Sequence, residues 1–253
     1  MSDAPLTLER SGKLLHLQFN RPASLNAIDS AMAEAFLGAV TEAVADDAIR
    51  VIILSGAGRS FMAGGDIAQF SRDPGSIPDS LIEPMNKAIL LLSGSDKLVL
   101  GSVQGPVAGA GMSLALVCDL LIAADNTRFS FAYTALAASG DLGISWSLPR
   151  LLGLRNAMGV ALLGDSIKAD EAQRLGLVNR VVAAEQLAEQ TLNLANQLAE
   201  LPALASASIK RLMQAAVQQD LGSQLAAEKQ AFSQCIEQPE FHTAVAGFLA
   251  KRK

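Results

Sequence analysis

Cysteine and histidine are scarce in this sequence, with two residues of each among 253. Cys118 and Cys235 lie far apart along the chain, so their number and spacing exclude a disulfide framework and a paired-cysteine metal site. We expect both thiols to be buried as small hydrophobic side chains. The sequence predicts neither a metal ion nor a redox cofactor.

Long apolar runs and long basic runs are missing as well. No apolar stretch reaches the roughly 18 to 20 residues of a membrane span, and the opening segment "MSDAPLTLERSGK" has no apolar core like that of a secretion signal. The net charge is −5, and Lys and Arg form a run only in the terminal "KRK". This balance argues against nucleic acid or an anionic membrane as the partner. We expect a cytoplasmic protein that acts on a small molecule.

Apolar residues, in contrast, make up 50% of the chain and follow a strand and helix pattern. Residues 51–55, "VIILS", form a β-branched run typical of a central parallel strand. Ser30 is expected to cap a helix in which apolar residues recur every three or four positions. Further strands are predicted at residues 14–19, 98–103 and 120–124. The first part of the chain is therefore predicted to be an α/β core.

The last part of the chain has a helical pattern throughout. It begins at about Glu185, and breaks are expected at Pro202, Gly222 and Pro239. We therefore predict two regions, a sheet-containing core over residues 1–200 and a helical region over 201–253.

Two glycine-rich turns each follow a predicted strand. They are "GAGRSF" at residues 56–61 and "GPVAGAGMS" at 105–113. Glycines in such turns let a ligand approach the backbone beyond the carboxyl ends of parallel strands. Neither turn completes the dinucleotide motif G-x-G-x-x-G, because Phe61 and Leu114 stand where the third small residue belongs. Dinucleotide binding is therefore disfavoured.

The turns could instead supply a nucleophile or backbone donors. "GMSLA" around Ser113 is similar to a nucleophile elbow, but only His16, inside a predicted strand, and His242 could act as its base, which disfavours a serine hydrolase. If "MAGGD" at 62–66 faces the start of the helical run at 111–119, two N–H groups converge on one point. Such a pair would form an oxyanion hole.

These segments and three others resemble the crotonase superfamily, the enoyl-CoA hydratases and isomerases, from end to end. The resemblance implies a spiral core of repeated ββα units, a C-terminal helical region that forms trimers, and an acyl-CoA thioester as ligand. In the order and spacing of the family, the matching segments are "NRPASLNAI" (20–28), "GAGRSFMAGGDI" (56–67), "VQGPVAGAGMSLALVCDLLIAAD" (103–125), "SWSLPRLLG" (145–153) and "ADEAQRLGLVNRVV" (169–182).

The resemblance assigns backbone roles to the two turns. It places the oxyanion donors at Ala63 and Ala110, and the adjacent glycines, Gly64, Gly65 and Gly109, beside the bound thioester. These donors are main-chain N–H groups, so an alanine where relatives often have glycine does not impair the role.

The resemblance also implies where coenzyme A binds and how the chains assemble. Relatives hold the adenine with turns that match Leu25, Ala27 and Ile67, and a lysine from a neighbouring subunit that matches Lys251 reaches the phosphates. Coenzyme A thus enters as part of the substrate. We expect a homotrimer or a dimer of trimers, with subunit contacts from apolar residues of the tail such as Leu204, Ile209, Leu212 and Met213.

The side chains at the predicted site favour isomerisation over hydration. Hydratases of this family use two glutamates to handle water, and the matching residues here are Ser113 and Tyr133, which cannot act as carboxylates near neutral pH. Asp141 resembles the catalytic aspartate of the ring-1,2-epoxyphenylacetyl-CoA isomerase branch, which shares "AGAG" (108–111) and "AMGVALLG" (157–164). The resemblance therefore implies a proton-shuttling isomerase of fatty acid or phenylacetate metabolism.

Asp141 and Asp66 are expected to play different parts. Asp141 is the sole acid between Asp125 and Asp165 and has apolar neighbours, so burial would raise its pKa and make it a suitable base. The alternative is that Asp141 caps the helix that follows. Asp66 is expected to bind local N–H groups and to have a structural role.

Three other functions stay open at this point. One is an enoyl-CoA hydratase, and one is an aromatic acyl-CoA dehalogenase that would use Asp141 as a nucleophile, although Asn86 stands where such enzymes have an assisting histidine. The third is an inactive binding protein with this fold. Ala138, Ser139 and Gly140 replace the Leu-Ile-Pro of the isomerase branch, so the sequence does not define the acyl group.

Overall fold

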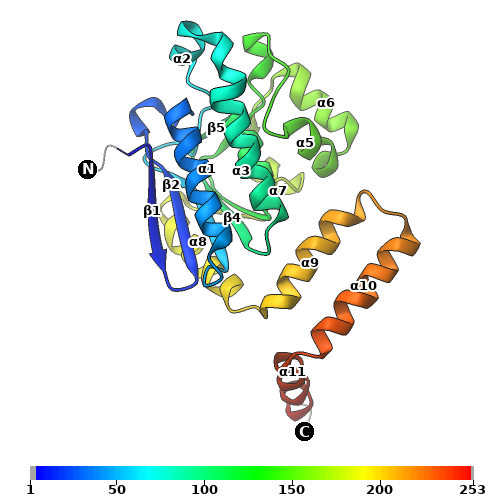
Figure 1. The fold of residues 1–253 in the computed structure, drawn as a ribbon. Coiled ribbons are helices and arrows are strands. Elements are labelled where there is room, and N and C mark those ends of the chain that lie inside the picture. Colours follow the sequence, from blue (N-terminus) through cyan, green and yellow to red (C-terminus); the bar gives the residue numbers. More distant parts are fainter. Residues whose placement is uncertain (1–3, 252–253) are drawn as a thin grey trace. The chain divides into compact units, whose positions relative to one another are not determined.

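The computed structural model describes residues 4–251 of the chain. Its backbone separates into two compact units that divide between Ala199 and Glu200. The first unit contains the sheets, and the second consists of helices (Figure 1). Over the described residues, none of the helices has both the length and the apolar character that crossing a membrane requires.

A six-stranded sheet forms the centre of the first unit. β1 and β2 pair antiparallel, and the other neighbours in the sheet run parallel. All four strands predicted from the apolar runs are present. β1 is an additional edge strand whose sequence, "LTLERS", is largely polar because most of its residues are exposed. In pairing order the strands are β1 (Leu6–Ser11), β2 (Leu14–Phe19), β3 (Val51–Gly56), β4 (Leu98–Val103), β6 (Leu120–Ala124) and β9 (Arg180–Val182).

Helices connect the strands and cover both faces of this sheet (Figure 1). A smaller sheet contains β5 (Pro106–Ala108), β7 (Arg128–Ser130) and β8 (Ile167–Lys168). The helices of the first unit are α1 (Ser30–Ala45), α2 (Ile67–Arg72), α3 (Glu83–Gly94), α4 (Ala110–Leu116), α5 (Ile144–Leu152), α6 (Leu154–Leu163), α7 (Ala169–Arg174) and α8 (Leu187–Ala199).

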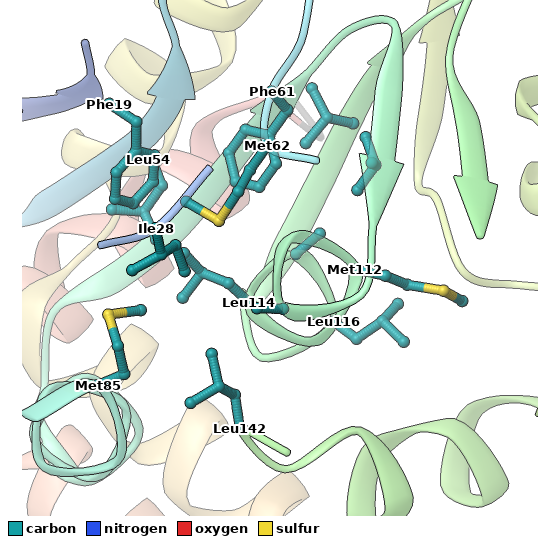
Figure 2. Close-up of a cluster of buried hydrophobic side chains, with 14 of the residues drawn as sticks. Phe19, Ile28, Leu54, Phe61, Met62, Met85, Met112, Leu114, Leu116 and Leu142 are labelled. Atoms are coloured by element: carbon teal, nitrogen blue, oxygen red, sulfur yellow. The ribbon is translucent and has the colours of Figure 1, made fainter. Parts of the chain in front are cut away.

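The parallel strands are buried on both faces, as the apolar run of β3 predicts. One face contributes Leu54 to a large core that includes residues of α1, α3 and α4. The other face contributes Ile53 to a smaller cluster beneath α8. Figure 2 shows part of the large core, where Phe19 and Phe61 lie close to Met62. Met62 thereby anchors the turn after β3 in the core.

The N-terminus of α1 differs from the prediction by one residue. Asp29, not Ser30, is the capping residue, and its carboxylate accepts a hydrogen bond of 2.9 Å from the Met32 N–H. Asp29 has the extended backbone that a cap requires, and Ser30 is already the first helical residue. The apolar face of the helix is as predicted, because Met32 and Phe36 are fully buried.

The second unit consists of α9 (Ala203–Ala216), α10 (Leu221–Ile236) and α11 (Pro239–Ala250). The predicted break at Gly222 is wrong, because Asp220 caps α10 and Gly222 lies in its first turn. The break instead occupies residues 217–220. On α9, Ile209 and Met213 are 58% and 72% exposed in the single chain.

Cys118 and Cys235 are not joined in a disulfide, and each is partly exposed. The expectation that both are buried is therefore wrong. Cys118 follows the end of α4 and packs against the large core, and Cys235 lies near the end of α10.

Candidate active site

Two turns meet beyond the carboxyl ends of β3 and β4. Met62 pairs with Val107 in an isolated parallel bridge, and the Ala108 N–H donates to the Met62 carbonyl at 3.0 Å. A Cβ at Gly111 would lie 2.2 Å from the same carbonyl oxygen, so only glycine lets α4 approach this closely. The structure therefore brings the turn at residues 62–66 next to the start of α4.

The N–H group of Ala63 is not free for a ligand, contrary to the prediction. It donates to the Leu25 carbonyl at 3.0 Å, which ties the turn to the loop before α1. In the same turn Gly64 accepts from the Ile28 N–H, and the Asp66 N–H donates to the Ile28 carbonyl. In an extended chain, the N–H groups of successive residues point to opposite sides. The Gly64 carbonyl and the Asp66 N–H face Ile28, so the N–H of Gly65, which lies between these two groups, points away from this loop.

Gly65 and Ala110 therefore carry the candidate donors. Within residues 4–251 neither N–H has a hydrogen-bond acceptor. A Cβ at Gly64 would lie 4.0 Å from the Ala110 nitrogen, so the two turns approach each other closely here. Gly109, directly before Ala110, has φ +51°, a conformation that glycine adopts without strain. Two unpaired N–H groups in adjacent turns can stabilise the oxygen of a polarised carbonyl.

A buried asparagine that the sequence analysis did not name holds the turn after β3 in place. Asn26 is fully buried, and its amide donates to the carbonyls of Ala57, Ser60 and Phe61 at 2.8 to 3.1 Å. Its carbonyl accepts from the Arg21 N–H at 2.8 Å. Asn26 belongs to the motif at residues 20–28, but no residue pattern indicates which polar side chain of that motif points inward.

Asp66 has the structural role that was predicted. Its carboxylate caps α2 by accepting from the N–H groups of Ala68 and Gln69, and it forms an ion pair of 2.8 Å with Arg21. The hydrogen bond from Arg21 is the main cause that lowers the pKa of Asp66. The carboxylate thus stays ionised and holds the turn, and it is not available as a proton acceptor.

The residues expected to hold coenzyme A fall into two groups. Leu25 and Ala27 lie in the loop tied to the turn at 62–66, and Ile67, at the start of α2, is 52% exposed. Lys251 is exposed directly after α11, in the second unit. The contacts of all four with coenzyme A stay predictions.

Asp141 lies in a constrained loop before α5 and does not cap this helix. Gly143 occupies the cap position, and no side chain forms a capping hydrogen bond there. Gly140, Leu142 and Gly143 all have positive φ angles, so the backbone on both sides of Asp141 is left-handed. This conformation is costly for Leu142 and points to a constraint on the carboxyl group between them.

The carboxyl group of Asp141 belongs to a chain of hydrogen bonds with the two predicted hydroxyl residues. The Tyr133 hydroxyl donates to Asp141 Oδ1 at 2.5 Å and lies 2.8 Å from Ser113 Oγ. Ser113 Oγ also lies 3.2 Å from the carbonyl oxygen of Gly109. The chain therefore leads from the carboxyl group to the residue that precedes the candidate donor Ala110.

Burial is the main influence on the acidity of the Asp141 carboxyl group. It raises the pKa of the Asp141 carboxyl, and the hydrogen bond from Tyr133 opposes the rise without cancelling it. Burial and the neighbouring Asp141 charge also raise the pKa of the Tyr133 hydroxyl, which stays protonated and acts as a donor. A carboxylate with a raised pKa is a stronger base than an exposed one, which suits proton abstraction.

A cavity of about 540 Å³ in the first unit lies apart from this site. It opens on the face of the main sheet that α8 covers, and Leu14, His16, Ile53 and Ser55 are among its lining residues. None of the predicted site residues lines it. In the described part of the chain, no group of three His, Cys, Asp or Glu residues is placed to hold a metal ion.

Comparisons with known proteins agree in family and fold. Residues 9–253 match the model of the enoyl-CoA hydratase/isomerase family. The 1,2-epoxyphenylacetyl-CoA isomerase of Escherichia coli K12 is 35% identical over 243 residues, which cover 94% of this chain and 93% of that protein. The predicted resemblance is thereby confirmed at the level of the family.

Solved structures show the same fold. The structure of an enoyl-CoA hydratase from Polaromonas sp. JS666 has a TM-score of 0.92 and is 32% identical, with 97% of each chain covered. A structure from Thermobifida fusca YX, solved in complex with acetoacetyl-CoA, has a TM-score of 0.86 and is 28% identical, covering 93% of this chain and 96% of that one. The predicted α/β spiral core with a helical C-terminal region is confirmed.

Proposed function

Because the chain belongs to the enoyl-CoA hydratase/isomerase family, we propose that it isomerises an acyl-CoA thioester with Asp141 as the general base. One observation carries the proposal, namely that the sole carboxyl group in the hydrogen-bonded chain of Ser113, Tyr133 and Asp141 has a raised pKa. A base whose pKa lies nearer to neutrality both removes and returns a proton efficiently.

The proposed reaction moves one proton and needs no further reactant. The N–H groups of Gly65 and Ala110 bind the thioester oxygen and stabilise the negative charge that develops on it. A C–H bond next to the conjugated system thereby becomes acidic. With an enoyl thioester, Asp141 takes the proton and returns it to another carbon of the resulting dienolate, so a double bond moves. With a ring epoxide, the electron pair of the broken C–H bond forms a new double bond and breaks a C–O bond of the epoxide, and Asp141 returns the proton to the oxygen that is released. Coenzyme A is part of the substrate, and the proposal includes no metal or other cofactor.

The names of the relatives support a proposal for the substrate class. The Escherichia coli relative is named for a ring epoxide of phenylacetyl-CoA, and the Thermobifida structure contains acetoacetyl-CoA. We therefore propose an enoyl-CoA or ring-epoxide acyl-CoA substrate, from fatty acid or phenylacetate metabolism. Residues 134–139, between Tyr133 and Asp141, are exposed and therefore accessible to an acyl group.

Hydration is the second candidate, because the Polaromonas structure is named an enoyl-CoA hydratase. The hydroxyl groups of Ser113 and Tyr133 could bind a water molecule. However, these hydroxyls already bond to each other, and that of Tyr133 also bonds to Asp141. Neither hydroxyl can accept a proton near neutral pH as a carboxylate does. This arrangement favours isomerisation.

One panel of assays tests the proposal. Purified protein is incubated with enoyl-CoA thioesters of different chain length and with ring-epoxide thioesters of phenylacetyl-CoA. Substrates and products are separated by liquid chromatography, and the mass of each peak is measured; the mass rises by one water molecule in hydration and is unchanged in isomerisation. We expect products of unchanged mass from at least one substrate, and their loss in Asp141→Asn. Products of increased mass alone would favour the hydratase, and no product from any thioester would favour a binding protein.

A further inference from the structure

We propose that Tyr133 is a positioning residue for the Asp141 carboxyl group, and that Ser113 gives the Tyr133 hydroxyl a partner in both protonation states of Asp141. The inference rests on the proposed function, in which Asp141 must hold a proton and then release it. It concerns the two hydroxyl groups that are hydrogen-bonded in line with the Asp141 carboxyl group.

The position of the Tyr133 hydroxyl is fixed by packing. Tyr133 lies in the 3-10 helix η4 (Tyr133–Leu136) and is 8% exposed, and its ring packs edge-on against Phe131 with the ring centres 5.1 Å apart. A Cβ at Gly140 would lie 3.3 Å from the Phe131 ring and 3.6 Å from the Tyr133 ring, so the loop that carries Asp141 presses on both rings. Packing therefore fixes the Tyr133 ring, and with it the position from which the hydroxyl reaches Asp141.

When Asp141 is ionised, all donors in the chain point toward the carboxylate. Tyr133 has one hydroxyl proton and donates it to Asp141 Oδ1 at 2.5 Å. Ser113 can then donate its own proton to the Tyr133 oxygen at 2.8 Å. Each hydroxyl proton has an acceptor in this state.

When Asp141 has taken a proton, the chain can reverse its direction. The carboxylic acid donates to the Tyr133 oxygen, Tyr133 donates to Ser113 Oγ, and Ser113 donates to the Gly109 carbonyl at 3.2 Å. That carbonyl has two lone pairs and also accepts from the Ser113 N–H. Both states are thus satisfied without an unpaired buried hydroxyl, which would otherwise oppose one of them.

Tyr133 also acts on the acidity of its partner. Its hydrogen bond lowers the pKa of Asp141 against the effect of burial. Removing the hydroxyl should therefore leave the carboxylate less stabilised and raise the pKa further. Tyr133→Phe keeps the ring and its packing, so it isolates the hydroxyl.

The test measures the titration of Asp141 without any substrate. Protein labelled with carbon-13 at the aspartate carboxyl groups is titrated by NMR, and the signal missing in Asp141→Asn identifies Asp141. In Tyr133→Phe we expect the midpoint to rise by about one pH unit, as loss of one hydrogen bond to a charged group implies. Ser113→Ala should move it less, because the direct bond from Tyr133 to the carboxylate remains.

Thr191→Val is the matched control. It removes another buried hydroxyl, which lies 2.7 Å from Ser102 Oγ and makes no contact with Asp141. We expect this variant to leave the Asp141 midpoint in place. An unchanged or lowered midpoint in a folded Tyr133→Phe protein would overturn the proposal, as would an equal rise in Thr191→Val.

Activity supplies a second readout. The acid limb of the profile of kcat/KM against pH should move up with the NMR midpoint in Tyr133→Phe. If the midpoint rises but no variant or wild-type protein isomerises any thioester, the positioning role stands and the proposed function fails. If the protein isomerises a thioester, but Tyr133→Phe moves neither the acid limb of the kcat/KM profile nor the NMR midpoint of Asp141, the positioning role fails and the proposed function stands.

Discussion

The Ala63 N–H and the Leu25 carbonyl oxygen form a hydrogen bond of 3.0 Å that joins two loops of the candidate site. The bond assigns Ala63 to the framework of the site and leaves Gly65 and Ala110 as the candidate donors. The distinction can be tested with substitutions to proline at Ala63 and at Ala110, because proline has no N–H group.

Ala110→Pro should reduce turnover but not stability. Ala110 is the first residue of α4, where proline is tolerated, and its N–H has no acceptor among the described residues. Loss of one oxyanion donor should lower kcat by about 10² to 10³-fold. Ala63→Pro is the contrasting variant, and it should lower the Tm because a framework hydrogen bond is lost. Near-normal turnover in folded Ala110→Pro would show that this N–H does not contact the reacting oxygen.

Asp141→Asn should abolish most isomerase activity and preserve binding. The amide keeps the shape of the side chain and an acceptor for Tyr133, but it cannot take up a proton. We expect a loss of at least about 10²-fold in kcat, as for a positioned general base, while binding of a CoA thioester, measured by calorimetry, stays similar. Ser113→Ala should lose much less activity. Full activity in folded Asp141→Asn would refute the mechanism.

The stability of the wild type relative to Asp141→Asn should depend on pH. The pKa of Asp141 in the folded protein is raised by burial, so the fold favours the neutral carboxyl group. The stability that the neutral Asp141 carboxyl group contributes is fully present below the pKa that this group has in the unfolded chain. This stability is lost as the pH rises through the raised pKa of the folded protein. We therefore expect the Tm of the variant to increase relative to wild type as the pH rises above about 4, the pKa of an aspartate in an unfolded chain. A decrease over this range would mean that burial does not raise the pKa of Asp141.

Asn26→Ala should destabilise the first unit. The Asn26 amide satisfies three backbone carbonyls, and alanine would leave the two buried contacts, to Ser60 and Phe61, unpaired. We expect the free energy of unfolding in urea to fall by at least about 2 kcal/mol. Ser24→Ala, at an exposed residue of the same loop, is the control and should change it little.

The protein should assemble as a homotrimer or a dimer of trimers. Ile209 and Met213 on α9 are largely exposed in the single chain, and apolar side chains of this kind are expected to be covered by other copies. Light scattering at micromolar concentration should give the mass of three or six chains. A monomeric mass would contradict the prediction.

The sequence predicts those parts of the fold that depend on local pattern. The run at residues 51–55 is apolar throughout because β3 is buried on both faces, and the alternation at 14–19 reflects a strand whose faces differ. β1 has no such signature, because its edge position leaves most of its side chains in water. The one-residue error at Ser30 arose because Asp29 and Ser30 are both good caps, and only the backbone conformation distinguishes them.

The candidate site was predicted in outline, but its contacts depend on tertiary structure. Family motifs indicate which turns meet, and they identify Ser113, Tyr133 and Asp141, which are hydrogen-bonded in the structure. They cannot show which N–H of a turn is already bonded, because the partner of Ala63 is the distant Leu25. The same holds for the bond between Tyr133 and Asp141, whose geometry depends on Phe131 and Gly140.

The candidate donors at Gly65 and Ala110 are main-chain groups, and this has a consequence for how such an enzyme can evolve. Every amino acid except proline supplies an N–H, so codon changes at these two positions seldom remove the donor itself. The groups at positions 113, 133 and 141 are side chains, and a single substitution at any of them exchanges a hydroxyl or a carboxyl for something else. Under the proposed function, a lineage can therefore acquire a new reaction by altering three side chains while it inherits the main-chain donors unchanged.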